Sequence, residues 1–317
     1  MRLMTRKVAG LIVVLLVVTT MSFLLLELLP QSPANIALGP FASKAAIAQF
    51  NHANGLDKPF LVQYWRYLTH ALHGDLGRDF INREPVWKAV HERLPATFEL
   101  LVLSQLLALA VAIPFGILSA YRPNGVIDRL SATLSFGLLA APSFVIALPL
   151  VLLFAVKWHF FPATGYAHIS DGLAHNLRSV LLPSITLALG SMAAYVRLLR
   201  ADMIATLQED FITMAKAKGL PTWKILLRHA FRPSTFSLVT VGGLNIGTLI
   251  GGTVIVETIF QLPGIGFLTI QSITERNYAM VQGTVLVIAV GYVVVNFLVD
   301  LLYTVIDPRV RHVGALA

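Results

Sequence analysis

The hydrophobic pattern of the chain is dominated by six apolar runs, and the segments between them carry most of the charge. Each run has roughly the 20 residues that an α-helix needs to cross the hydrocarbon core of a bilayer. The fourth run is the weakest, because prolines, glycines and hydroxyl side chains dilute it. The pattern predicts an all-α integral membrane protein with six transmembrane helices. The predicted spans are Val8–Leu29, Thr97–Ala120, Leu130–Val156, Val180–Leu199, Phe236–Ile259 and Val281–Ile306.

The first run also has the position of a secretory signal peptide. Its apolar core is longer than that of a signal peptide, and no small-x-small cleavage site precedes the charged region that follows. We therefore interpret Val8–Leu29 as a retained span. The chain then divides into an N-terminal helix (1–29), an extracytoplasmic segment (30–96), a membrane domain (97–308) with a cytoplasmic loop (201–233), and a cytoplasmic tail (309–317).

Lysine and arginine in the short loops predict the orientation of the spans. With six spans, the opposite short loops hold only Lys157, Arg178 and Arg276. Because basic loops stay in the cytoplasm, we expect both termini to be cytoplasmic. The basic residues that share the cytoplasmic side are Arg2, Arg6, Lys7, Arg122, Arg129, Arg197, Arg200, Lys216, Lys218, Lys224, Arg228, Arg232, Arg309 and Arg311.

Composition supports a membrane protein. Of 317 residues, 56% are hydrophobic and 13% are charged, against roughly 25% charged in soluble domains. Lipid must therefore solvate part of the surface. The net charge of +8 arises mostly from basic residues in the predicted cytoplasmic loops. We therefore interpret it as a topology signal and expect no nucleic-acid partner. The chain has no cysteine, which excludes disulfides, thiol catalysis and thiolate metal sites.

The extracytoplasmic segment contains one clear helical pattern. Over Pro59–His73, the apolar residues Leu61, Tyr64, Trp65, Leu68 and Leu72 have helical spacing. A glycine-rich turn follows, and then Pro85–Leu94 repeats the pattern more briefly. We expect a small, partly helical cap on the outer face.

The cytoplasmic loop is predicted to form two short helices joined at Gly219. Glycine suits the left-handed position after a helix, and Pro221 suits the first turn of the next one. Such an elbow, attached to two spans, suits the transmission of motion between a soluble partner and the membrane. An amphipathic connector resting on lipid is the alternative. The expected inward-facing residues are Met203, Ile204, Leu207, Phe211, Met214 and Ala215 in the first helix, and Trp223, Leu226, Leu227 and Ala230 in the second.

Several sequence motifs occur in order along nearly the whole chain. They are HGDLGR from His73, RLPATFEL from Arg93, FITMAKAKGL from Phe211, RHAFR from Arg228, VETIFQLPGIG from Val256, RNY from Arg276, VQG from Val281, DLLY from Asp300 and DPR from Asp307. In these motifs the sequence resembles the permeases of ATP-binding-cassette (ABC) importers, in particular the branch for dipeptides, oligopeptides and nickel. It departs from the family signature where Thr213 replaces the usual Glu and where Pro233 replaces Asn.

The resemblance implies a type I ABC importer permease fold, a location in a bacterial inner membrane, and transport of dipeptides or oligopeptides. It implies a second permease, different but homologous, two ATP-binding domains or subunits, and an extracytoplasmic solute-binding protein. It also implies that the loop docks in a groove of the ATPase subunit. The expected coupling residues are Ala215, Lys216, Ala217, Lys218, Gly219 and Leu220. The chain has no Gly-Lys pair, and hence no phosphate-binding loop. We therefore expect a non-catalytic subunit without cofactor, with ATP and Mg bound by its partners.

The fifth span carries the candidate pathway residues. Gly243, Gly247 and Gly251 recur every fourth residue, flanked by Gly242 and Gly252, and serve either static packing or sliding of helices. Polar side chains are costly in a bilayer and point to function. The candidates are Asn245, Glu257, Asn296 and Asp300, and we expect Asn245, Glu257, Gly247 and Gly251 to belong to the substrate pathway or its gate.

Three alternatives follow from other patterns. A nickel or other small-solute permease is the nearest one, although His70 and His73 alone do not predict a metal site. A secondary transporter requires repeated halves with buried charges at the midplane, which the sequence lacks. A membrane-embedded enzyme requires a convergent catalytic cluster, and none is found. The residues do not define the substrate.

Overall fold

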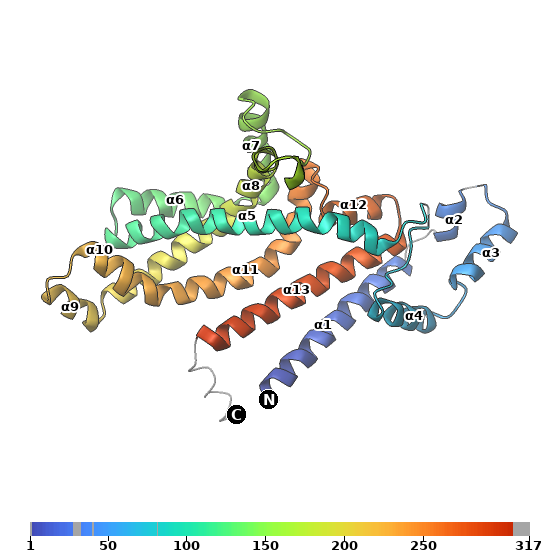
Figure 1. Ribbon diagram of the computed structural model, residues 1–317, viewed down its shortest axis with the longest axis horizontal. Coiled ribbons are helices and arrows are strands. Elements are labelled where there is room, and N and C mark those ends of the chain that lie inside the picture. Colours follow the sequence, from blue (N-terminus) through green and yellow to red (C-terminus); the bar gives the residue numbers. More distant parts are fainter. Residues whose placement is uncertain (1, 28–32, 40, 81, 307–317) are drawn as a thin grey trace. The chain divides into compact units, whose positions relative to one another are not determined.

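The computed structural model describes residues 2–27, 33–39, 41–80 and 82–306 (Figure 1). Within these ranges the chain is helical, and the only β-structure is an isolated bridge between Arg78 and Pro85. The predicted tail (309–317) and the side chain of Asp300 lie outside the description. The elements are α1 (Arg2–Glu27), α2 (Pro33–Leu38), α3 (Lys44–Asn54), α4 (Phe60–Leu72), α5 (Val86–Tyr121), α6 (Val126–Ala140), α7 (Ser143–Leu150), the π-helix η1 (Val151–Lys157), the 3₁₀-helix η2 (Ile169–Asp171), α8 (Leu173–Leu207), α9 (Asp210–Ala217), α10 (Thr222–Lys224), the π-helix η3 (Ile225–Ala230), α11 (Phe231–Phe260), α12 (Ile265–Thr274) and α13 (Tyr278–Ile306).

The spans confirm an all-α membrane protein, although the number six stays a prediction. Among the described residues, 4 helices are long and apolar enough to cross a bilayer, or up to 5 if one bent pair counts as a span. In α1, the side chains that the structure describes form the apolar stretch Ala9–Leu24. The four long spans are Val86–Tyr121, Leu173–Leu207, Thr222–Phe260 and Tyr278–Val299.

The third span is not the continuous helix that we expected over Leu130–Val156. Helices α6 and α7 meet at an angle of 109°. Between them, Ala141 has an extended backbone with φ −90° and ψ 123°, and Pro142 follows. The proline ring disfavours helical backbone at the preceding residue, so α6 ends there.

The segment that was predicted to be extracytoplasmic (30–96) is more helical than expected. The helix expected over Pro59–His73 is confirmed as α4, while α2 and α3 were not foreseen. The short helix expected over Pro85–Leu94 is not separate, because α5 runs without a break from Val86 through Pro95 into the second span.

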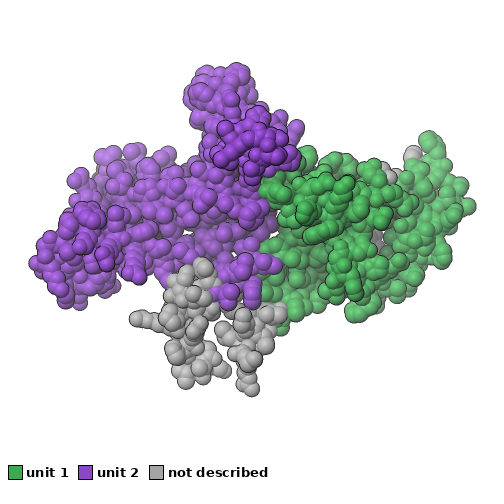
Figure 2. All heavy atoms as spheres, in the orientation of Figure 1, with its two compact units in different colours: residues 1–97, 263–293 green, residues 98–262, 294–317 purple. Residues whose placement is uncertain are grey.

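The chain folds into two compact units, shown in Figure 2. Unit 1 comprises residues 1–97 and 263–293, and unit 2 comprises residues 98–262 and 294–317. The core of unit 1 joins the start of α5 to α12 and to the start of α13. Its buried residues are Leu76, Val86, Ala89, Val90, Ile265, Leu268, Ala279 and Met280.

A glycine permits a close helix contact in unit 1. A Cβ atom on Gly283 of α13 would lie 2.3 Å from Cγ1 of the fully buried Val86, which is far below van der Waals distance. The absence of a side chain at Gly283 therefore lets α13 lie against α5.

We predict that Gly283→Ala destabilises the protein by about 1–3 kcal/mol, the usual cost of overpacking a core. The measurement is the thermal unfolding midpoint of the purified protein in detergent. Gly291→Ala is the matched control, because nothing lies within 4 Å of a Cβ atom there in the same helix. Adding Val86→Ala to Gly283→Ala should cost less than Val86→Ala costs in the native chain, and strictly additive effects would contradict the steric explanation.

Candidate functional site

The elbow between α8 and α11 turns at Gly219 as predicted. Gly219 has φ +72°, and the backbone N–H of Leu220 donates to the carbonyl of Ala215 at 3.3 Å. This six-to-one bond, with a left-handed glycine inside it, is the pattern that ends helices in a Schellman motif. Pro221 then immediately precedes the next helix, at Thr222.

The inner side of the elbow is firmly packed in unit 2. Ile212 and Ala215 of α9 and Ile225 and Ala230 of η3 are buried in one core. Met203 at the end of α8 belongs to the same core, together with residues of α5 and α11. The elbow is therefore attached rigidly to the helices that it connects.

The prediction of which elbow residues face inward is partly wrong. Phe211, Met214, Trp223 and Leu227 were expected inside, but their side chains are between 45% and 65% exposed. The helical phase restarts after α8, because Glu209 is extended and precedes a new helix, and Ile212 then takes the inner position. In the second half, the π-helical turn of η3 begins at Ile225 and shifts the phase before Leu227, while Trp223 lies ahead of it in α10. We call these four side chains the exposed elbow residues.

The six expected coupling residues fall into two groups. Lys216, Ala217, Lys218 and Gly219 are exposed at the corner. Ala215 is buried and Leu220 is partly buried against the same core, so these two support the corner from inside.

An ion pair joins α6 to α8 near the elbow. Arg200 donates through Nε and Nη2 to the carboxylate of Asp128, the second contact at 2.8 Å. Asp128 also accepts from the backbone N–H of Asn124 at 2.7 Å. One turn away, the guanidinium of Arg197 lies 4.5 Å from the ring centre of Phe136. Both arginines were interpreted from the sequence only as topology signals, and Asp128 was missed, although an acid that opens an apolar run is a detectable signal.

A hydrogen-bonded network crosses the middle of unit 2 through α5, α8 and α11. The amide nitrogen of Asn245 donates to Tyr195 Oη at 2.9 Å and to Ser191 Oγ at 2.6 Å. Tyr195, which is fully buried, donates to Gln105 Oε1 at 2.9 Å. The structure thus gives Asn245 a role in joining helices. Its predicted place in the pathway stays a prediction, supported by Thr248, an exposed hydroxyl bonded to the Asn245 side chain at 3.0 Å.

The glycines of α11 do not form one continuous contact surface. A Cβ atom on Gly243 would lie 2.7 Å from Val299 of α13, so this glycine is needed for packing. Gly242 faces Tyr195 and Gly252 faces Leu187, both on α8, while Gly247 is buried. Gly251 has nothing within 4 Å of a Cβ atom and is exposed.

The remaining polar candidates lie at different depths. Glu257 is fully buried in the last turn of α11, and its carbonyl accepts from the N–H of Leu262 at 2.9 Å. This bond closes the turn at Gln261, which has left-handed φ of 52°. Asn296 is half-buried, and the side chain of Asp300 is not described.

A second polar cluster in unit 2 was missed by sequence reasoning. Glu99 of α5 accepts from Tyr166 Oη at 2.8 Å and from Asn176 Nδ2 at 3.2 Å. Asn176 is fully buried and also donates to the carbonyl of Ala167 at 2.9 Å. Burial, and then the bond to Glu99, raise the pKa of the Tyr166 phenol above its usual range, so Tyr166 stays the proton donor. The cluster fixes the loop before α8 to α5.

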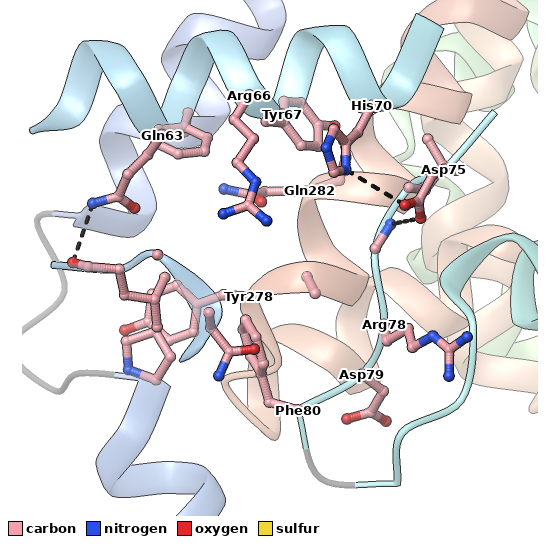
Figure 3. Close-up of a pocket in the computed structure, with 18 of the residues that line it drawn as sticks. Gln63, Arg66, Tyr67, His70, Asp75, Arg78, Asp79, Phe80, Tyr278 and Gln282 are labelled. Atoms are coloured by element: carbon pink, nitrogen blue, oxygen red, sulfur yellow. Dashed lines mark hydrogen bonds and ion pairs between the residues drawn. The ribbon is translucent and has the colours of Figure 1, made fainter. Parts of the chain in front are cut away.

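A polar cavity of about 660 Å³ lies within unit 1 (Figure 3). Arg66, Arg78 and Asp79 line it together with Tyr278 and Gln282 of α13. His70, another lining residue, approaches Asp75 at 3.4 Å. His73 bonds instead to the carbonyl of Thr69 at 2.7 Å, so the two histidines do not converge on one point.

Comparison with known families identifies the chain. Residues 112–312 match the family described as binding-protein-dependent transport system inner membrane component. Residues 1–101 match the corresponding N-terminal family. The chain belongs to this family. This permease therefore has the type I ABC importer fold and is a multi-pass protein of the inner membrane. The match overturns the alternative of a secondary transporter.

Individual relatives agree over nearly their full length. A putative peptide transport system permease protein of Brucella abortus is 39% identical over 98% of this chain and 99% of its own. A probable peptide ABC transporter permease protein of Sinorhizobium fredii is 36% identical over 97% and 98% of the two chains. A glutathione transport system permease protein of Pectobacterium atrosepticum is 36% identical over the same shares. ATPase and solute-binding partners follow from this class of transport system.

We predict that Arg200→Met destabilises the permease more than the double variant Asp128→Asn/Arg200→Met does. The Asp128 side chain is only 5% exposed, and removing one partner of a buried ion pair typically costs about 3–5 kcal/mol. Unfolding midpoints in detergent measure the difference. Arg228→Met, at an exposed position of the elbow, is the control with little expected effect. A double variant as unstable as Arg200→Met would contradict the pairing.

For the central network, we predict that Tyr195→Phe lowers stability by about 0.6 and at most about 1.7 kcal/mol, the measured range for hydrogen bonds between membrane helices. Asn245→Leu should cost less in the Tyr195→Phe background than in the native chain. Thr258→Val is the control, since its hydroxyl bonds only within α11. Additivity of the Tyr195 and Asn245 substitutions in unfolding titrations would show that the two residues act separately.

Proposed function

We propose that the permease imports dipeptides or oligopeptides, and that it forms the translocation pathway together with a second, different permease subunit. The support for peptides comes from the names of the relatives, two of which refer to peptides and one to glutathione, itself a tripeptide. Nickel or another small solute is the alternative within the same branch. A solute-binding protein delivers the substrate, and two ATP-binding domains bind ATP and Mg, while this chain holds no cofactor.

The elbow carries the proposed coupling to ATP hydrolysis. Its exposed residues Phe211, Met214, Trp223 and Leu227 surround a corner whose inner side is fully packed. Burying one large apolar side chain stabilises a complex by about 1.5–3 kcal/mol, so these residues favour a protein partner. The distribution of basic residues over the loops supports a cytoplasmic position for this elbow and for both termini, on the side where the ATPase subunits act.

The packing explains how force passes through the elbow. A displacement of the corner moves Ile212 and Ile225, which are buried against α8 and α11. Because packed interiors resist compression, both helices must follow. Asn245, Gly247, Gly251 and Glu257 lie further along α11 and belong to the proposed substrate pathway or its gate.

We predict that Gly219→Trp abolishes copurification of the ATPase subunits and uptake of labelled peptides. The substitution adds a large side chain at the exposed corner and strains a left-handed backbone. Gly74→Trp is the matched control, because Gly74 has φ +82° and open space but lies in unit 1, so the ATPase should still copurify.

Uptake of a labelled dipeptide, a labelled longer peptide and nickel, in cells with and without the permease, tests the substrate. If neither peptide depends on the permease while nickel does, the peptide proposal fails. If the Gly219→Trp variant inserts normally and retains its ATPase subunits, the coupling proposal fails independently of the substrate.

A further inference from the structure

Helix α4 presents three chemically different faces. Leu61, Trp65 and Leu72 project from one side and are 75%, 68% and 85% exposed. Gln63, Arg66 and His70 project from the opposite side and line the polar cavity, as Figure 3 shows. No described element covers the apolar side, although large exposed apolar stripes normally mark an interaction surface.

The third face of α4 packs against α1. The ring of Phe23 lies 5.4 Å from that of Phe60 and 5.7 Å from that of Tyr64. The hydroxyl of Tyr64 forms hydrogen bonds of 2.9 Å with Thr19 and 2.8 Å with Thr20. These contacts fix the position of α4 along the axis of α1.

A contact with α13 gives a second measure of how far α4 lies below the outer end of a spanning helix. Tyr67 of α4 donates to the backbone carbonyl of Gln282 at 3.1 Å. Gln282 lies four residues inside the first residue of α13, which is about 6 Å at the helical rise. On α1, Thr20 lies seven residues inside Glu27, the last residue of that helix, which is about 10 Å.

The two distances from the helix ends, about 6 and about 10 Å, agree with the position of a helix that lies in the membrane interface. Amphipathic helices that lie in a membrane surface bury their apolar face about 5–10 Å into the boundary between headgroups and acyl chains. Tryptophan is enriched at that boundary, where Trp65 would then lie. The polar face of α4, with Arg66 and the cavity, is turned to the opposite side.

We propose that α4 lies in the bilayer interface at the C-terminal end of α1 and binds lipid through Leu61, Trp65 and Leu72. A soluble partner would have to enter the membrane by about 6–10 Å to cover this face, according to the helical rise that sets both distances. Lipid is therefore the occupant, and the segment between α1 and α5 is partly embedded. The inference rests on α1 and α13 crossing the bilayer, not on the identity of the substrate.

The experiment is a spin-label scan of α4, which the absence of cysteine in the chain makes direct. Single cysteines replace Leu61, Trp65 and Leu72, and in matched variants Gln63, Arg66 and His70. Each variant is labelled within the assembled transporter in lipid nanodiscs, with cysteine-free partner subunits. Collision rates of the label with oxygen, which concentrates in lipid, and with a water-soluble nickel chelate are then compared.

We expect the ratio of oxygen to nickel collisions to be severalfold higher at Leu61, Trp65 and Leu72 than at the three polar-face positions. High nickel accessibility at the apolar positions would overturn the proposal in favour of a solvated face. Low accessibility to both reagents, or a loss of accessibility on adding the solute-binding protein, would overturn it in favour of a protein partner. A label at Val13, which is 57% exposed on α1, tests separately whether α1 lies in lipid.

Discussion

Hydrocarbon offers no hydrogen-bond partners, and this constraint shapes every level of the permease. Backbone groups are paired within helices, so the described chain contains almost no other structure. The same constraint acts on side chains, which pair across helices where they are polar. Asn245 pairs with Tyr195 in this way within the predicted spans, whereas Asp128 with Arg200 and Glu99 with its two partners connect distant elements near the ends of the predicted spans. These bonds give specificity to a bundle whose apolar surfaces alone would pack in many ways.

The inner and outer sides of the elbow differ in side-chain size and in burial. Inside, small and branched side chains such as Ala215 and Ile212 are packed to full burial. Outside, large apolar side chains such as Trp223 remain in contact with solvent. The packed inner side is a rigid support for the exposed apolar surface. Such a support suits the proposed conversion of docking into movement, because a flexible support would absorb the displacement.

The sequence predicted those features that depend on local chemistry. Span positions follow from hydropathy, because the bilayer sets the length of a helix that crosses it. Gly219 was identified because a left-handed turn after a helix favours glycine at a single position. The helix at Phe60–Leu72 followed from its apolar spacing.

The features that were missed depend on phase or on distant contacts. The bend of 109° after α6 follows from Pro142, but nothing in the hydropathy of Leu130–Val156 distinguishes a bent span from a straight one. The inner face of the elbow was predicted by extending one helical period across Glu209 and through a π-helical turn, and each break rotates the residues that follow. Pairs such as Asp128 with Arg200 or Glu99 with Tyr166 join residues that only tertiary folding brings together.

The exposed elbow residues also bear on how such a transporter is made in the cell. A permease chain synthesised without its ATPase subunits would display Phe211, Met214, Trp223 and Leu227 to the surrounding proteases and chaperones, which recognise exposed apolar side chains. Assembly would conceal this signal. If this surface docks the ATPase subunits as proposed, the same residues mark an orphan subunit for removal and tie the abundance of the permease to that of its partners.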